Sequence, residues 1–96
     1  MIPSDISIIF RGKTTPRIAL AELADELLNE IEGIGDVTQS RNEEFGWSIF
    51  ARVESTSAVN AVVIAMGRLL SQQGIRADSV SVEVAGQRSS LSKLVP

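Results

Sequence analysis

The stretch SAVNAVVIAMGRLLSQQG, residues 57–74, is the segment around which the rest of the chain is organised. Its apolar residues recur at the three- and four-residue spacing of one buried helix face. That face consists of Val59, Val62, Val63, Met66, Leu69 and Leu70. The other side carries Arg68 as its only charge, whereas a helix face in water usually carries several. We therefore expect a helix that the chain covers from one side and a partner covers from the other.

The outward side of this helix is small and uncharged, which allows another helix or sheet to approach closely. Surfaces of this kind are typical of interfaces. The interface residues predicted here are Asn60, Ala61, Ile64, Gly67 and Arg68, with Ala65 beside them. Two alternatives remain open: a weakly amphipathic helix in a stable monomer, and cover by the chain's own Leu91, Leu94 and Val95.

Composition excludes several classes of function. The chain has 96 residues with 44% hydrophobic and 22% charged residues, as expected for one globular domain rather than a disordered or membrane protein. It contains no cysteine, histidine or tyrosine, so disulfides, thiolate metal sites and histidine acid–base chemistry are absent. The net charge of -3 opposes binding by phosphate neutralisation. We expect a cytoplasmic protein that is not an enzyme and has no cofactor, metal, nucleic acid or membrane partner.

The remaining segments alternate between strand and helix patterns. Strands are predicted at 5–11, 37–41, 45–54 and 79–85, with a hairpin turn at 42–44. A first helix is predicted at 16–32, with Thr15 as its cap and Pro16 at its first position. Its apolar face is Leu20, Leu23, Ala24, Leu27, Leu28 and Ile31. Each helix ends at a glycine followed by an isoleucine that packs back on the last turn, at Gly33 and at Gly74.

The element order strand, helix, strand, strand, helix, strand predicts an α+β fold, a ferredoxin-like βαββαβ two-layer sandwich. Right-handed crossovers place the first and third strands inside a four-stranded antiparallel sheet, with both helices on one face. We assign residues 1–86 to this single domain and residues 87–96 to a Ser-rich C-terminal tail.

The predicted sheet has one face toward the helices and one open face. The helix-facing residues are Ile6, Ile8, Phe10, Trp47, Ile49, Val80, Val82 and Val84. The open face shows Ile9 and Phe50 between Arg11 and Arg52. A face-to-face dimer, in which Ile9 and Phe50 meet their symmetry mates and the arginines pair with Glu83 or Glu54, is one interpretation, and scattered surface residues are the other. RNA binding is disfavoured because only one aromatic side chain lies on this face.

The loop Gly12, Lys13, Thr14 and Thr15 joins the first strand to the first helix and is a candidate anion site. It lacks the first glycine of a phosphate-binding loop, because Ser7 stands at that position. A glycine loop at a helix N-terminus still suits an anion, and plain helix capping is the alternative.

Three functions follow as hypotheses. The first is a non-catalytic interaction or accessory domain that self-associates through the second helix, the open sheet face or both. The second is a regulatory module that senses a small anion or nucleotide at the Lys13 loop. The third is an acidic inhibitor or immunity-type protein that presents Glu22, Asp25, Glu26 and Glu30 of the first helix to a basic partner.

Overall fold

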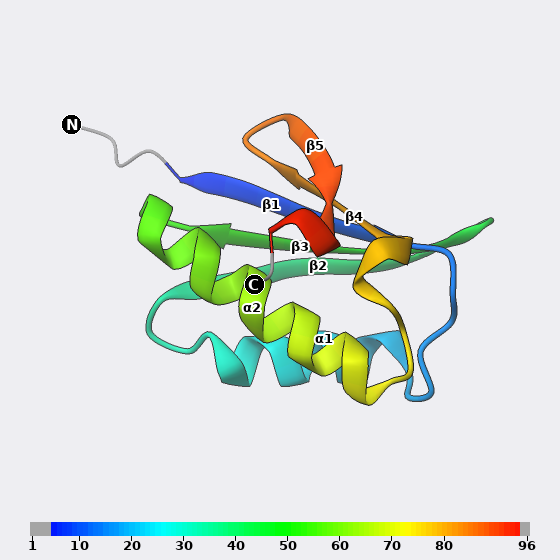
Figure 1. Ribbon diagram of the computed structural model, residues 1–96. Helices are drawn as coiled ribbons and strands as arrows, with labels where there is room; N and C mark the ends of the chain where they lie inside the picture. Colours follow the sequence, from blue (N-terminus) through cyan, green and yellow to red (C-terminus); the bar gives the residue numbers. More distant parts are fainter. Residues whose placement is uncertain (1–4, 95–96) are drawn as a thin grey trace.

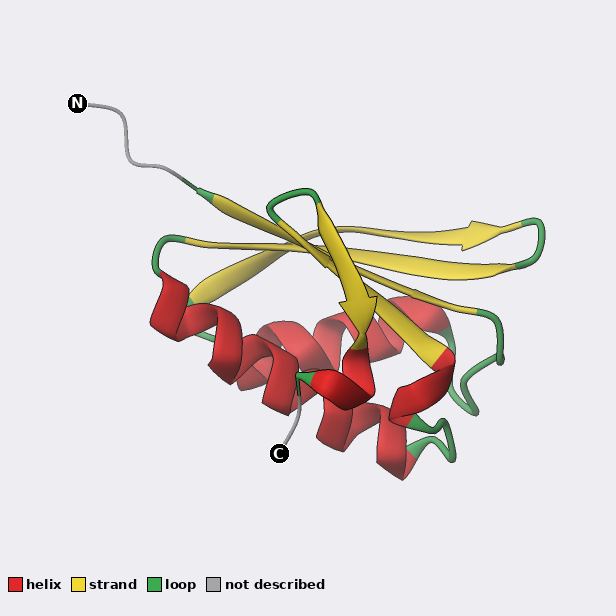
Figure 2. Cartoon of the chain, turned by 45° about the horizontal axis from the view of Figure 1, so that its top comes forward, coloured by secondary structure: helices red, strands yellow, loops and turns green. Residues whose placement is uncertain are grey.

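Two α-helices cover one face of a five-stranded antiparallel sheet in the computed structural model, which describes residues 5–94 (Figures 1 and 2). In chain order the elements are β1 (Ile6–Gly12), α1 (Leu20–Glu30), β2 (Gly35–Glu43), β3 (Gly46–Val53), α2 (Thr56–Gln72), the 3-10 helix η1 (Ala77–Ser79), β4 (Val80–Val84), β5 (Gln87–Ser90) and the 3-10 helix η2 (Leu91–Lys93). Across residues 5–94, none of the helices combines the length and the hydropathy needed to span a membrane.

The strand order is β2-β3-β1-β4-β5, and every neighbouring pair is antiparallel. β1 and β3 lie inside the sheet, as predicted, and the polar strand β2 forms one edge. The prediction of four strands is wrong. The fifth strand, β5, pairs along the outer side of β4 and belongs to the segment that the sequence analysis assigned to a tail.

A two-residue turn explains the additional strand. Val84 pairs with Gln87, so Ala85 and Gly86 alone connect β4 to β5. Both have positive φ values, 51° and 86°, which is the backbone of the tight hairpin turn that matches the twist of paired strands. Ala85 is an uncommon residue for this conformation, because a Cβ atom disfavours positive φ. The turn therefore gave little signal in the sequence.

The segment after β5 contributes one residue to the core. Leu91 of η2 is fully buried, whereas Leu94 is 38% exposed. Val95, which the sequence analysis considered together with these two leucines as a cover for α2, lies outside the described residues. The described part of the predicted tail is therefore paired and packed through β5 and Leu91.

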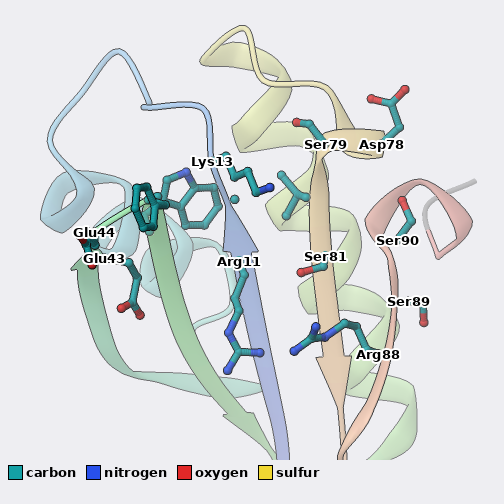
Figure 3. A pocket seen from close by; sticks show the side chains of 15 residues that line it. Arg11, Lys13, Glu43, Glu44, Asp78, Ser79, Ser81, Arg88, Ser89 and Ser90 are labelled. Atoms are coloured by element: carbon teal, nitrogen blue, oxygen red, sulfur yellow. The ribbon is translucent and has the colours of Figure 1, made fainter.

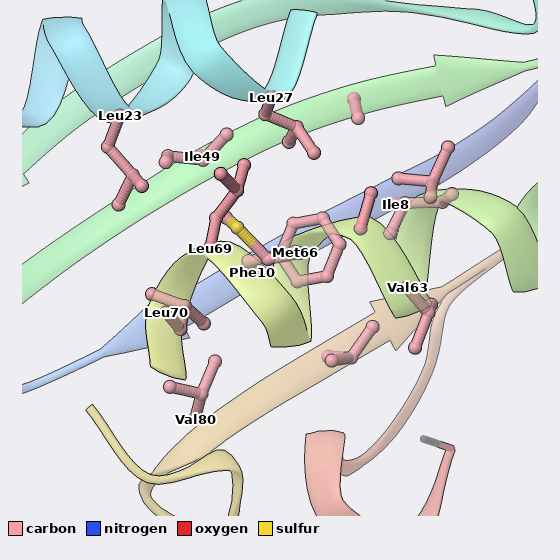
Figure 4. Packing of buried hydrophobic residues seen from close by; sticks show 14 of the residues in the cluster. Ile8, Phe10, Leu23, Leu27, Ile49, Val63, Met66, Leu69, Leu70 and Val80 are labelled. Atoms are coloured by element: carbon pink, nitrogen blue, oxygen red, sulfur yellow. The ribbon is translucent and has the colours of Figure 1, made fainter. Parts of the chain in front are cut away.

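The hydrophobic core lies between the sheet and α2 and α1 (Figure 4). The predicted face of α2 is confirmed for Val62, Val63, Met66, Leu69 and Leu70, which are buried, while Val59 is partly buried. Ala58 and Ala65 are also buried, so the placement of Ala65 on the outward side was wrong. The small Ala65 side chain widens the contact between α2 and the rest of the core.

The ends of α2 follow local rules. Ser55 precedes the helix, and its Oγ accepts a hydrogen bond from the backbone N–H of Ala58 at 3.2 Å. At the other end Gly74 has φ +74°, and the Ile75 N–H donates to the carbonyl of Leu70 at 2.9 Å. Ile75 is 4% exposed and packs back on the helix, as the glycine–isoleucine pair predicts.

The first helix is shorter than predicted because the residues expected at its start make contacts with other parts of the chain. α1 begins at Leu20 after Ala19, and no side chain caps it, so Thr15 and Pro16 do not start the helix. Pro16 is buried, and the Thr14 carbonyl accepts a hydrogen bond from the Trp47 ring N–H at 2.8 Å. These long-range contacts outweigh the local helix signal.

Two apolar residues at the C-terminal end of α1 lie outside the core. Gly33 has φ +88°, as predicted, but the following Ile34 is 42% exposed and does not pack back as Ile75 does. The buried Ile31 covers this end of the core instead, and Leu28 is exposed rather than part of the buried face.

The β2–β3 hairpin is longer than predicted, and its turn is shifted. Glu43 pairs with Gly46, so Glu44 and Phe45 form the turn in place of residues 42–44. Trp47, Ile49, Ala51 and Val53 face the core as predicted. Phe45 does not, because it lies in the turn beyond the strand and is 80% exposed.

Candidate functional site

The sheet face opposite the helices carries a small apolar patch at its centre. Ile9 of β1 and Phe50 of β3 are direct register partners, and both are half-buried. Residues opposite one another on one face of an antiparallel pair are close enough for their side chains to contact. The two residues that the sequence singled out on this face are therefore neighbours.

Ion pairs surround this patch. The Arg11 Nη1 atom lies 3.4 Å from Glu83 Oε1, and the Arg88 Nη2 atom lies 3.8 Å from the same oxygen. On the other side the Arg52 Nε atom lies 3.6 Å from Asp5 Oδ2. Glu83 was one of the two predicted partners of the arginines and does lie beside Arg11, whereas the partner of Arg52 is Asp5 and not Glu54. Each pair is partly exposed and therefore contributes little to stability. Together the pairs form a charged rim around the Ile9–Phe50 patch.

A cleft of about 760 Å³ opens at one end of this face, where β1 ends and β3 and β4 begin (Figure 3). Its walls come from four segments: the end of β1, the β2–β3 hairpin, η1 with the start of β4, and β5. Its lining includes apolar Phe45, Trp47 and Val80, basic Arg11, Lys13 and Arg88, hydroxyl-bearing Ser79, Ser81, Ser89 and Ser90, and acidic Glu43, Glu44 and Asp78.

Two glycines and a tryptophan fix the shape of the cleft. Gly12 is buried against the Trp47 ring, and a Cβ atom there would lie 2.5 Å from a ring carbon. Gly46 packs on the backbone of Gly12, and a Cβ atom on Gly46 would overlap the Gly12 carbonyl oxygen. The Trp47 hydrogen bond to Thr14 then holds the loop after β1 against the hairpin. The hairpin and the loop are therefore positioned as one unit.

The four residues of the candidate anion loop do not line one pocket together. Lys13 lines the cleft, Gly12 lies under the Trp47 ring, and the Thr14 carbonyl is taken by Trp47. Thr15 lines a second hollow, which Lys13 and the hairpin residues 42–46 also border. Since α1 begins at Leu20, its free amides do not directly follow this loop. Within residues 5–94, Lys13 makes no ion pair.

The outward side of α2 lies in the helix layer and not on the open sheet face, so the structure separates the two predicted surfaces (Figure 2). Asn60 and Ala61 are exposed, Ile64 is 45% exposed, and Gly67 is half-buried. Arg68 donates a hydrogen bond to Glu30 of α1 at 3.1 Å, so this charge joins the two helices.

Sequence reasoning missed most of the cleft. Phe45 was predicted within a strand and Arg88 in a tail, and the cleft joins them because it brings together segments far apart in the chain. Trp47 is buried on the helix-facing side as predicted and also lines the cleft. One local signal was present, since an aromatic residue directly after two glutamates is well placed for an exposed turn. Within residues 5–94 no cluster of three or more aspartate, glutamate, histidine or cysteine side chains is arranged to hold a metal ion.

Comparison of the chain with protein-family models, with curated proteins and with solved structures finds no match. The surfaces described above are therefore the basis for a proposed function.

Proposed function

We propose that this protein is a non-catalytic interaction domain that self-associates through its open sheet face. The observation that carries the proposal is the Ile9–Phe50 patch surrounded by ion pairs on a sheet face that the described helices leave uncovered. An apolar centre with a polar rim is the usual composition of a protein interface.

The fold supports this function without defining it. We infer that β1, α1, β2, β3, α2 and β4 form a ferredoxin-like βαββαβ unit, to which β5 adds a fifth strand. The sheet order β2-β3-β1-β4 within the larger sheet supports this inference. Folds of this kind serve many activities, so the surface features carry the proposal. The exposed Ile64 and its small neighbours on α2 are a second candidate contact surface.

The test is the molecular mass of the purified protein, measured by light scattering and sedimentation from about 1 μM to about 1 mM, a range that includes weak interfaces. Self-association predicts a mass that rises with concentration, and a monomer throughout overturns the proposal. Phe50→Lys and Ile64→Lys then distinguish the two surfaces. If only Phe50→Lys restores the monomer, the sheet face is the interface; if only Ile64→Lys does, α2 is.

A second candidate function is the sensing of a small anion, because Lys13 lines the cleft and makes no ion pair with residues 5–94. Thermal unfolding with inorganic phosphate or ATP tests it. Anion binding predicts a stabilisation that Lys13→Ala removes and that Lys93→Ala, an exposed lysine on η2, retains. The Lys13 site is excluded for these two anions if neither stabilises the wild-type protein, or if Lys13→Ala and Lys93→Ala lose the stabilisation equally.

A further inference from the structure

The tip of the β2–β3 hairpin projects from the body of the molecule. The last register pair between β1 and β3 joins Gly12 to Trp47, and Gly46 packs on Gly12, so residues 43–45 extend beyond β1 (Figures 1 and 2). At the tip, Phe45 is 80% exposed, the most exposed of the large hydrophobic side chains in residues 5–94. Exposing a phenylalanine ring to water is unfavourable, so this position points to a contact.

The body side of the neighbouring cleft is basic. Lys13, Arg11 and Arg88 line it and supply three positive charges. Arg11 and Arg88 share the single carboxylate of Glu83, and Lys13 makes no ion pair within residues 5–94. Positive charge therefore remains on this wall after the pairing within the chain.

Val80 and Trp47 also line this wall, but they are only 2% and 3% exposed, so the apolar surface on this wall comes mainly from the hydrocarbon stems of Arg11, Lys13 and Arg88. Asp78 lines the cleft as well, but its carboxylate is 2.8 Å from the Arg76 guanidinium, which offsets its charge. The body side of the cleft is therefore basic, with apolar surface along the stems of its basic side chains.

The tip consists of Glu43, Glu44 and Phe45, so it is acidic and aromatic. An acidic, aromatic segment is the chemical complement of a basic wall, because carboxylates pair with the basic groups and an aromatic ring packs on their charged heads and hydrocarbon stems. The tip of one chain forms the rim of its own cleft, so it does not fill that cleft. A second copy, related by a two-fold axis beside the tip, would bring its own tip to the cleft and receive the first tip in return.

The geometry points to a reciprocal dimer in which the hairpin tip of each copy, led by Phe45, docks into the cleft of the other. Glu44 of one copy faces Lys13 of the other, and the Phe45 ring lies on the side chains of Arg11 and Arg88. This inference rests on the proposed self-association and names its contact. It moves the main apolar anchor from the Ile9–Phe50 patch to the end of the same sheet face.

A charge exchange between separate copies tests the contact. In a dimer of Glu44→Lys the introduced lysine faces Lys13, and in a dimer of Lys13→Glu the introduced glutamate faces Glu44, so each variant alone is expected to be monomeric. In an equal mixture of the two variants, a dimer with one copy of each places opposite charges at both contacts. We expect native mass spectrometry to detect this mixed dimer. An intrachain contact cannot produce this result, because mixing leaves the charges of each copy unchanged.

A second variant tests the ring. Phe45→Ser removes two buried rings per dimer and is expected to raise the dissociation constant about 100-fold or more. The matched control is Ile34→Ser, at an apolar residue 42% exposed in the α1–β2 connection, which is expected to leave it unchanged. Circular dichroism of each variant confirms that the fold is retained.

The outcomes separate this inference from the proposed function. A wild-type protein that is monomeric at all concentrations overturns both. A wild-type dimer that persists in Phe45→Ser, Glu44→Lys and Lys13→Glu overturns the hairpin contact and leaves self-association standing. Loss of the dimer in both charge variants without recovery on mixing also overturns the contact. Recovery in the mixture supports it.

Discussion

Replacement of Gly46, the half-buried first residue of β3, by alanine is expected to destabilise the fold strongly. Gly46 has φ +151°, and an added Cβ atom would overlap the Gly12 carbonyl oxygen and lie 3.1 Å from the Gly12 carbonyl carbon. Both contacts are with backbone, so no side-chain rotation relieves them. The hairpin must move away from β1 by about 1 Å to restore an ordinary contact distance.

Two terms set the size of the effect. A residue with a side chain in this backbone region costs about 1–3 kcal/mol. Separation of the hairpin from β1 also disturbs the packing of Gly12 on the Trp47 ring, and overpacking of this kind costs about 1–3 kcal/mol. We expect Gly46→Ala to lower the free energy of unfolding by about 2–6 kcal/mol, the sum of these terms.

Gly33→Ala provides a matched control. Gly33 also has a positive φ, +88°, but an added Cβ atom would have no neighbour within 4 Å. Gly33→Ala is therefore affected only by the unfavourable positive φ, and we expect it to lower the free energy of unfolding by about 1 kcal/mol. Urea unfolding followed by the fluorescence of Trp47, the only tryptophan, measures both variants. If the two variants differ by less than about 0.5 kcal/mol, the close approach of the hairpin to Gly12 is wrong.

Three further substitutions test the core and the cleft. Met66→Ala in the middle of α2 is expected to cost about 2–5 kcal/mol in urea unfolding, and a cost under about 0.5 kcal/mol would mean that α2 is rotated. Leu91→Ala is expected to lower the free energy of unfolding by about 2–4 kcal/mol because Leu91 of η2 is fully buried. Leu94→Ala, at an exposed position, should change it by less than about 0.5 kcal/mol. Equal small effects of the two variants would place the segment after β4 outside the core. Trp47→Phe removes the donor to the Thr14 carbonyl and is expected to cost about 1–3 kcal/mol by thermal unfolding followed by circular dichroism, and no loss would mean that this hydrogen bond does not hold the loop.

Periodicity in the sequence was enough to predict both helices and the core faces of the inner strands. The spacing of Val62, Met66 and Leu69 allows only one buried side of a helix, and the alternation of Trp47 and Ile49 allows only one buried side of a strand. The register partners Ile9 and Phe50 were placed on the open face by the same rule. These features depend on near neighbours in the chain, which the sequence displays directly.

The features that could not be predicted depend on distant contacts. The start of α1 is set by Trp47, which lies 33 residues from Thr14, and no local pattern at Pro16 reveals it. β5 depends on a turn in which Ala85 takes an uncommon backbone conformation. The cleft joins four separate segments, so its residue types have no shared spacing along the chain.

β5 affects whether the chain can pair with other copies of itself through the edge of its sheet. β4 is the valine-rich strand VSVEV, and a strand of this kind with free backbone groups along one side is a template for pairing with other chains. β5, with the sequence QRSS, occupies that side and presents polar side chains in its place. A chain ending at Gly86 would leave the outer backbone of β4 bare. We expect such a chain to aggregate into fibrillar material, so that the short serine-rich strand acts as a guard against misassembly.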